Sequence, residues 1–156
     1  MTVSLHLAAG AATGVAIQKY LPPDVSLPER AFCAFVAGLL SHIFLDAFPH
    51  QEYSSGGRVL WAFILGETGL VFALVLLPVD NFVAGAIIFF GMAGGALPDV
   101  LELLYTYFFR QEWLASLSAI CHLGVHGMVP LSFRVNFWWQ SLTAFIFALF
   151  VIFKSI

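Results

Sequence analysis

The stretch LLSHIFLDAFPHQEY, residues 39–53, places ionisable side chains inside one of the most apolar parts of the chain. His42, Asp46 and His50 follow one another at steps of four residues. At about 100° per residue, each step rotates the side chain by only some 40°, so the three share one face of a helix. An ionisable group at the centre of a membrane costs on the order of 2.5–3.5 kcal/mol. Three such groups on one face therefore predict a functional site.

The composition of the chain favours a membrane protein. Its 156 residues are 61% hydrophobic and 16% aromatic, and only 10% are charged, with a mean hydropathy of +0.95. A water-soluble domain needs roughly a quarter of its residues charged. The net charge is only -3 and the basic residues are scattered, which argues against nucleic acid as a partner. We therefore expect an integral membrane protein with a single polytopic domain, residues 1–156.

Apolar runs near the roughly 20 residues that a membrane helix needs recur along the chain. They cover Thr2–Leu21, Arg30–Phe48, Arg58–Pro78, Asn81–Leu97 and Asn136–Phe153. A further apolar segment, Glu112–Leu131, is interrupted by Gly, His and Pro, so it is either a full span or a broken, re-entrant element. The pattern predicts an all-α, compact bundle of about five transmembrane helices.

The basic residues give an expectation for topology. Lys19 and Arg30 flank the first loop and Arg58 the second, whereas the third loop has none. The positive-inside rule then places the first loop in the cytoplasm and the N-terminus outside. The N-terminal stretch lacks the basic region of a signal peptide, so we expect a retained first span. The expected location is a multi-pass protein of the prokaryotic plasma membrane.

Other ionisable residues also interrupt the apolar runs. Asp99 and Glu102 are three residues apart and His122 and His126 are four apart, so each pair faces one way on a helix. If the first four runs form hairpins, successive runs cross the membrane in opposite directions. The first and third runs then start at the same membrane face at which the second and fourth runs end. One membrane depth is then shared by His6, the ionisable residues of the 42–50 stretch, and the pair Asp99 and Glu102. Imidazoles and carboxylates gathered in this way are typical ligands of zinc or another divalent transition metal.

Four positions keep more than one interpretation. Asp99 and Glu102 are either part of the site or solvated residues at a helix end. Glu67, between Gly66 and Gly69, is either a further metal ligand or an interhelical hydrogen-bonding residue. His6 is either a ligand or a packed histidine near the membrane boundary.

Three motifs resemble those of the predicted membrane-bound metal-dependent hydrolases. They are HLAAGAATG at residues 6–14, GLLSHIFLDAFPH at 38–50 and GALPDV at 95–100. The run His42-x-x-x-Asp46-x-x-Pro49-His50 is also similar to the metal-binding helix of zinc-dependent phospholipases C and single-strand-specific zinc nucleases. The order of the motifs differs from that of the familiar family members. Here the Ser-His-x-x-x-Asp helix comes before the Pro-Asp pair, whereas in those members it comes after.

The resemblance implies a ligand set and a cofactor. It implies one to three divalent metal ions, most simply zinc, that activate water against a phosphodiester. The implied ligands are His6, His42, Asp46, His50, Asp99, His122 and His126.

The first functional hypothesis is a membrane-embedded metal-dependent hydrolase. Its substrate would be a phospholipid or a lipid-linked phosphate ester near one membrane face, attacked by metal-activated water. The candidate general bases are Asp46 and Glu102. The alternatives are a cation or proton transporter that uses the same His, Asp and Glu residues, and a haem-binding protein that uses His6, His42 or His122. A purely structural membrane protein would not need ligand-like spacing, and the oligomeric state stays open.

Overall fold

Helices account for almost all of the chain that the computed structural model describes, which comprises residues 3–48, 58–77, 79–122 and 133–155. The elements are α1 (Val3–Tyr20), α2 (Leu27–Asp46), α3 (Arg58–Leu76), α4 (Phe82–Leu103), the π-helical segment η1 (Leu104–Phe109), α5 (Glu112–His122) and α6 (Phe133–Ser155). No strand occurs in these ranges. The all-α expectation is confirmed.

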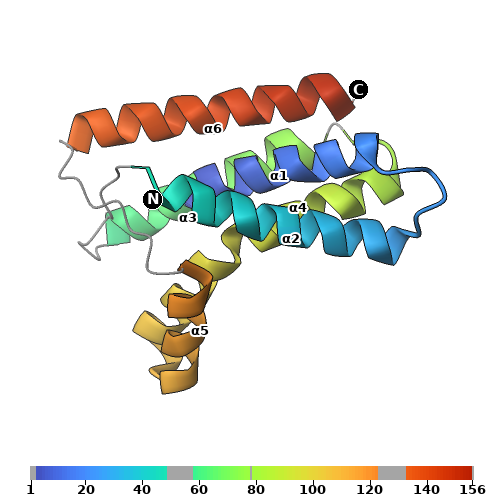
Figure 1. Cartoon of the computed structure of the whole chain (residues 1–156). Helices are drawn as coiled ribbons and strands as arrows, with labels where there is room; N and C mark the ends of the chain where they lie inside the picture. The colour runs from blue at the N-terminus through green and yellow to red at the C-terminus, as the bar shows by residue number, and fades with distance from the viewer. Residues whose placement is uncertain (1–2, 49–57, 78, 123–132, 156) are drawn as a thin grey trace.

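Helix α1 is the centre of the bundle. It packs against α2, α3, α4 and α6, and α6 lies along it (Figure 1). Small and apolar residues on all sides of α1 are buried, among them Leu5, Ala8, Ala11 and Val15. A helix that is apolar all round is expected in such a surrounded position.

Glycines set the close packing of α1, α2 and α4. Gly10 and Gly14 of α1 and Gly91 and Gly95 of α4 each form a Gly-x-x-x-Gly pair. A β-carbon on Gly91 would collide with the backbone carbonyl of Gly10, and one on Gly95 would collide with the carbonyl of His6. Such pairs allow helix backbones to approach closely inside membranes. The packing therefore brings the first turns of α1 against the last turns of α4.

Two helix boundaries differ from the expectation. The second run begins at Leu27 rather than Arg30, because Glu29 accepts hydrogen bonds from the backbone N–H and the hydroxyl of Ser26, at 3.0 and 2.7 Å. These bonds hold the first turn of the helix. The same run ends at Asp46 and not at the predicted Phe48. The reason is that the residue before a proline, here Phe48 before Pro49, disfavours helical backbone angles.

The fourth run is longer than the sequence predicted. It does not end at Leu97: α4 continues through Pro98 to Leu103, and η1 extends it to Phe109. Asp99 and Glu102 therefore lie inside a helix and not beyond its end. The last part of α4 and η1 turn away from the rest of the bundle, and α5 runs back beside them (Figure 1). Helix α5 covers the first half of the segment expected to be a broken span.

Two helical stretches among the described residues are long and apolar enough to cross a membrane. They are α2 and the continuous helix Phe82–Phe109. Phe32, Leu40 and Phe44 form a stripe on the outer face of α2 and are 68, 60 and 65% exposed. Large apolar side chains on the outside, with His and Asp inside, are the arrangement expected of a lipid-facing bundle. The structure thus supports membrane association, whereas the full set of five spans stays a prediction.

Candidate metal centre

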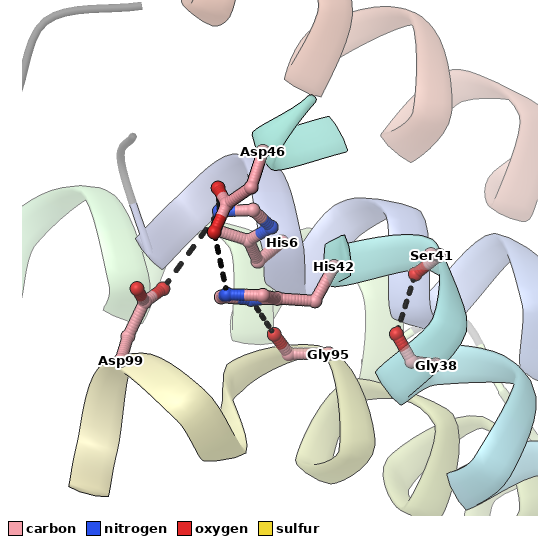
Figure 2. Close-up of polar contacts among 7 residues, drawn as sticks. All are labelled: His6, Gly38, Ser41, His42, Asp46, Gly95 and Asp99. Atoms are coloured by element: carbon pink, nitrogen blue, oxygen red, sulfur yellow. Dashed lines mark hydrogen bonds and ion pairs between the residues drawn. The ribbon is translucent and has the colours of Figure 1, made fainter. Parts of the chain in front are cut away.

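Four of the predicted ligands meet at one end of the bundle. His6 comes from the first turns of α1, His42 and Asp46 from the end of α2, and Asp99 from the last turns of α4 (Figure 2). The side chains of both histidines are 0% exposed, that of Asp46 is 2% and that of Asp99 is 16% exposed. Three helices, α1, α2 and α4, therefore build one buried polar cluster.

Asp46 lies between the two imidazoles. Its Oδ1 is 3.3 Å from Nε2 of His6, and its Oδ2 is 3.1 Å from Nε2 of His42. The two rings are stacked, with their centroids 3.8 Å apart and their planes inclined by 28°. Each carboxylate oxygen therefore faces a different histidine.

A backbone carbonyl fixes the orientation of His42. Its Nδ1 lies 2.8 Å from the carbonyl oxygen of Gly95. A carbonyl can only accept, so Nδ1 is the donor, and in the neutral ring Nε2 carries the lone pair. Metal-bound histidines commonly use their second nitrogen in this way. The hydrogen bond thus presents Nε2 of His42 as a ligand atom.

Pro98 lies in the turn of α4 that carries both Gly95 and Asp99. A proline inside a helix lacks the N–H donor and pushes against the carbonyl four residues earlier, which here belongs to Gly94. The adjoining carbonyl, that of Gly95, receives the hydrogen bond from His42. Pro98 therefore disrupts the backbone hydrogen bonding of α4 at this turn. The same turn supplies the Gly95 carbonyl and the Asp99 carboxylate to the cluster.

Asp99 faces the same Nε2 of His6 as Asp46 does, but from α4 (Figure 2). Its Oδ2 lies 4.0 Å from Nε2 of His6. Within the described part of the chain, this oxygen and Nδ1 of His6 are buried without a hydrogen-bond partner, and Nε2 of His6 faces the carboxylates of Asp46 and Asp99. Buried polar atoms without partners are uncommon and call for an explanation such as an ion.

The donor set fits a divalent metal ion. Ligand atoms of His6, His42 and Asp99 all lie within 4.8 Å of one another, and Asp46 contacts both histidines. Neutral imidazole and carboxylate are ligands that zinc and related ions accept. Asp46 and Asp99 both contact imidazoles, which are charged only when protonated. A cation would compensate two buried negative charges, which are otherwise costly in a low-dielectric interior.

The other predicted site residues are not part of this cluster as far as the structure describes them. Glu67 is half-buried on α3, outside the group of converging ligand atoms. Glu102 is half-buried one turn beyond Asp99, outside the group of converging ligand atoms. His122 is the last residue of α5, and its side chain lies outside the description. His50 and His126 lie outside the described residues.

Ser41, part of the Ser-His-x-x-x-Asp motif, does not join the cluster. Its hydroxyl donates to the carbonyl of Gly38 in its own helix, at 2.7 Å (Figure 2).

The sequence-based prediction missed the glycines that assemble the centre. Gly95 supplies the acceptor for His42 and lets the backbone of His6 approach. The signal was present, because Gly91 and Gly95 repeat the spacing of Gly10 and Gly14. Small residues four apart predict closely packed membrane helices.

Comparisons with known proteins do not assign the chain to a family. It matches no protein-family model, no curated protein and no solved structure.

Proposed function

We propose that this chain is a membrane-embedded hydrolase that uses a divalent metal ion, most simply zinc, on a phospholipid or lipid-linked phosphate ester. The observation that carries the proposal is the meeting of His6, His42, Asp46 and Asp99 from three helices in one buried cluster. An ion held by such ligands polarises a phosphoryl oxygen and makes water a better nucleophile near neutral pH.

The position of the cluster supports a lipid substrate. His6 is the fourth residue of α1 and Asp46 is the last of α2, so both lie near helix ends rather than midway along them. Helix ends of an apolar bundle are expected near the headgroup level, where the phosphate of a lipid is located. Asp99 keeps some exposure, which gives the cluster an accessible side.

The chain's own residues have separate roles in this proposal. Gly95 orients His42 through Nδ1, and Asp46 is held between the two imidazoles, which favours a ligand role over a free base. Glu102 is one turn from Asp99 and outside the ligand group, so it is the better candidate for the general base.

The alternative functions have less support. A transport path predicts ionisable residues along the whole bundle, whereas the histidines and aspartates that converge here gather at one end. A haem held between His6 and His42 would need space for the macrocycle, but these rings are stacked at 3.8 Å.

The proposal is tested by metal content and hydrolysis together. We expect wild-type protein, purified in detergent without chelator, to contain zinc or another divalent metal, and His42→Ala and Asp46→Ala to lose it. A screen of phospholipids and lipid-linked phosphates should then give phosphate or headgroup release that the same substitutions abolish.

A matched control is Asp24→Asn, which removes an exposed carboxylate in the loop at the other end of the bundle. It should keep both metal and activity. Metal-free wild-type protein that does not take up metal on addition would refute the site, and metal without hydrolysis of any lipid phosphate would refute the hydrolase.

A further inference from the structure

A helical hairpin leaves the bundle at the end where the candidate metal ligands meet. It consists of η1 and α5, residues 104–122, and we call it the aromatic hairpin. Arg110, with a left-handed φ of 45°, turns the chain between the two segments, and α5 contacts η1, α4 and α2. Asp99 lies in the last turns of α4, directly before the hairpin.

The outer surface of the aromatic hairpin is rich in large apolar side chains. Seven of them are 36–65% exposed: Tyr105, Tyr107, Phe108, Phe109, Trp113, Leu117 and Ile120. Apolar groups gathered on one exposed element mark a surface that contacts lipid or another protein. The hairpin therefore needs a partner beyond its own bundle.

Helix α5 presents two different faces. Leu114 and Ser118 are 3 and 8% exposed and form the face that packs within the structure. Trp113, Leu117 and Ile120 follow one another at steps of four and three residues, so they form a separate stripe on the outside. The apolar stripe is thus not explained by packing within the described chain.

Charged and polar groups lie beside these apolar side chains. Arg110, Gln111 and Glu112 are exposed at the turn of the hairpin, and Ser116 is exposed on α5. Arg110 and Glu112 would be costly in the hydrocarbon core, whereas the aromatic side chains are poorly suited to water. The headgroup boundary of a bilayer accommodates both, and Trp and Tyr are enriched there.

The direction of the hairpin agrees with this environment. The 20 residues of α2 are about 30 Å long, which matches the hydrocarbon core of a bilayer. Helix α5 runs across the direction of α2 and not along it (Figure 1). Its 11 residues are only about 16 Å long, too short for a span. If α2 crosses the bilayer, α5 therefore runs along the membrane plane.

We propose that the aromatic hairpin lies flat in the headgroup boundary of the bilayer, with Trp113, Leu117 and Ile120 directed toward the acyl chains. Because α5 contacts α2, this surface adjoins the exposed apolar stripe of α2 that ends at Phe44. The hairpin would hold the end of α4, and with it Asp99, at the depth of the lipid phosphates. The inference rests on the membrane location in the proposed function and is independent of metal binding and hydrolysis.

The test measures the depth of spin labels on the full chain in vesicles of phosphatidylcholine and phosphatidylglycerol. Cys33→Ser and Cys121→Ser remove the native thiols, and Leu117→Cys, Ser116→Cys or Val36→Cys then supplies one labelling site. EPR power saturation compares collisions with oxygen, which concentrates in lipid, and with a water-soluble nickel chelate. Val36 is exposed midway along α2 and gives the deep reference, and Ser116 is the matched control beside the apolar stripe.

We expect the Leu117 label about 5–10 Å below the lipid phosphates. It should be shallower than the Val36 label, and the Ser116 label should collide mainly with the nickel chelate. A Leu117 label that meets nickel as often as the Ser116 label would place the hairpin in water and overturn the proposal. A Leu117 label as deep as the Val36 label, or one shielded from both reagents by a second copy of the chain, would also overturn it.

The Val36 label separates this proposal from the proposed function. If nickel reaches that label freely, the chain does not cross the bilayer, and the membrane location fails together with the hairpin. If the Val36 label is deep and the Leu117 label is in water, only the hairpin proposal fails.

Trp113→Phe gives a second measurement that leaves the native cysteines in place. The difference in fluorescence between the wild type and this variant is the emission of Trp113. Lipids brominated near the headgroup should quench that emission more than lipids brominated near the chain ends. The reverse order, or no quenching by either lipid, would overturn the proposal. Circular dichroism and gel filtration in detergent identify any variant that fails to fold.

Discussion

The side chains of the candidate metal centre differ in their contacts and in their exposure. Nδ1 of His42 is held by the Gly95 carbonyl, and Nε2 faces Asp46. Nδ1 of His6 has no hydrogen-bond partner among the described residues, and its Nε2 faces both aspartates. Asp99 is the most exposed member, at 16%. Its removal should therefore disturb the fold least while still removing a ligand.

Asp99→Asn is expected to weaken metal binding with little loss of stability. The amide keeps the size of the side chain but removes the negative charge that a divalent ion favours. Affinity should fall by more than the roughly 10- to 100-fold that the loss of an outer-shell partner costs. Titration with zinc and a competing chelator measures this change. Asp80→Asn, an exposed carboxylate near the other end of α4, is the control, and equal affinities in the two variants would contradict the role of Asp99.

At the scale of elements, the contact between α1 and α4 determines whether the ligands meet. Gly91 and Gly95 lie against the backbone carbonyls of Gly10 and His6. Pro98 interrupts the same helix within one turn of Gly95. A short stretch of α4 thus controls both the distance between helices and the direction of the ligands.

Gly95→Ala and Gly91→Ala should destabilise the bundle. The added methyl would press on backbone that has no flexible side chain to move, and overpacking typically costs about 1–3 kcal/mol. Thermal unfolding in detergent measures the loss. The matched controls are Gly66→Ala and Gly69→Ala on α3, where a β-carbon would meet nothing within 4 Å. These two should leave stability unchanged or slightly raised, because alanine favours helix. Equal effects on α3 and α4 would refute the packing argument.

Pro98→Ala should weaken metal binding without unfolding the helix. Alanine restores the backbone N–H, which can bond to Gly94, and thereby favours a straight α4. Asp99 and the Gly95 carbonyl would then move relative to His42. The expected result is helicity equal to wild type, a lower zinc affinity and an altered visible spectrum of the Co²⁺-loaded protein. An unchanged spectrum would show that Pro98 does not position these groups.

For the whole molecule, the candidate metal ligands come from α1, α2 and α4, which also pack closely against one another. An ion bound to all three should stabilise the folded state by mass action. The remaining surface is largely apolar, with exposed Phe, Leu and Trp side chains on α2 and α6. The candidate metal ligands and the close helix packing therefore belong to the same bundle.

Removal of metal should lower the unfolding temperature of the wild-type protein. At free zinc one hundred times the Kd, binding contributes about 2.7 kcal/mol. Thermal unfolding with chelator and with graded zinc measures this shift. His42→Ala should unfold at one temperature under both conditions. A zinc-dependent shift of equal size in that variant would place the stabilising ion elsewhere.

The sequence by itself determined the helical architecture and the choice of candidate ligands. Apolar length and composition predicted the helices to within a few residues except near Pro98, and the spacing of His42 and Asp46 put them on one face, because helix geometry is local. The predicted end of the fourth run at Leu97 was wrong, because α4 continues to Leu103. A proline interrupts backbone hydrogen bonding, but it need not end a helix that is packed in a bundle.

Only the tertiary structure decided how the ligands relate to one another. That Asp46 lies between two stacked imidazoles, and that Gly95 orients His42, depends on the distance and rotation between three helices. Those quantities follow from close glycine contacts between residues about 80 positions apart in the chain. No local pattern fixes them, because the periodicity of one helix carries no information about its rotation against another.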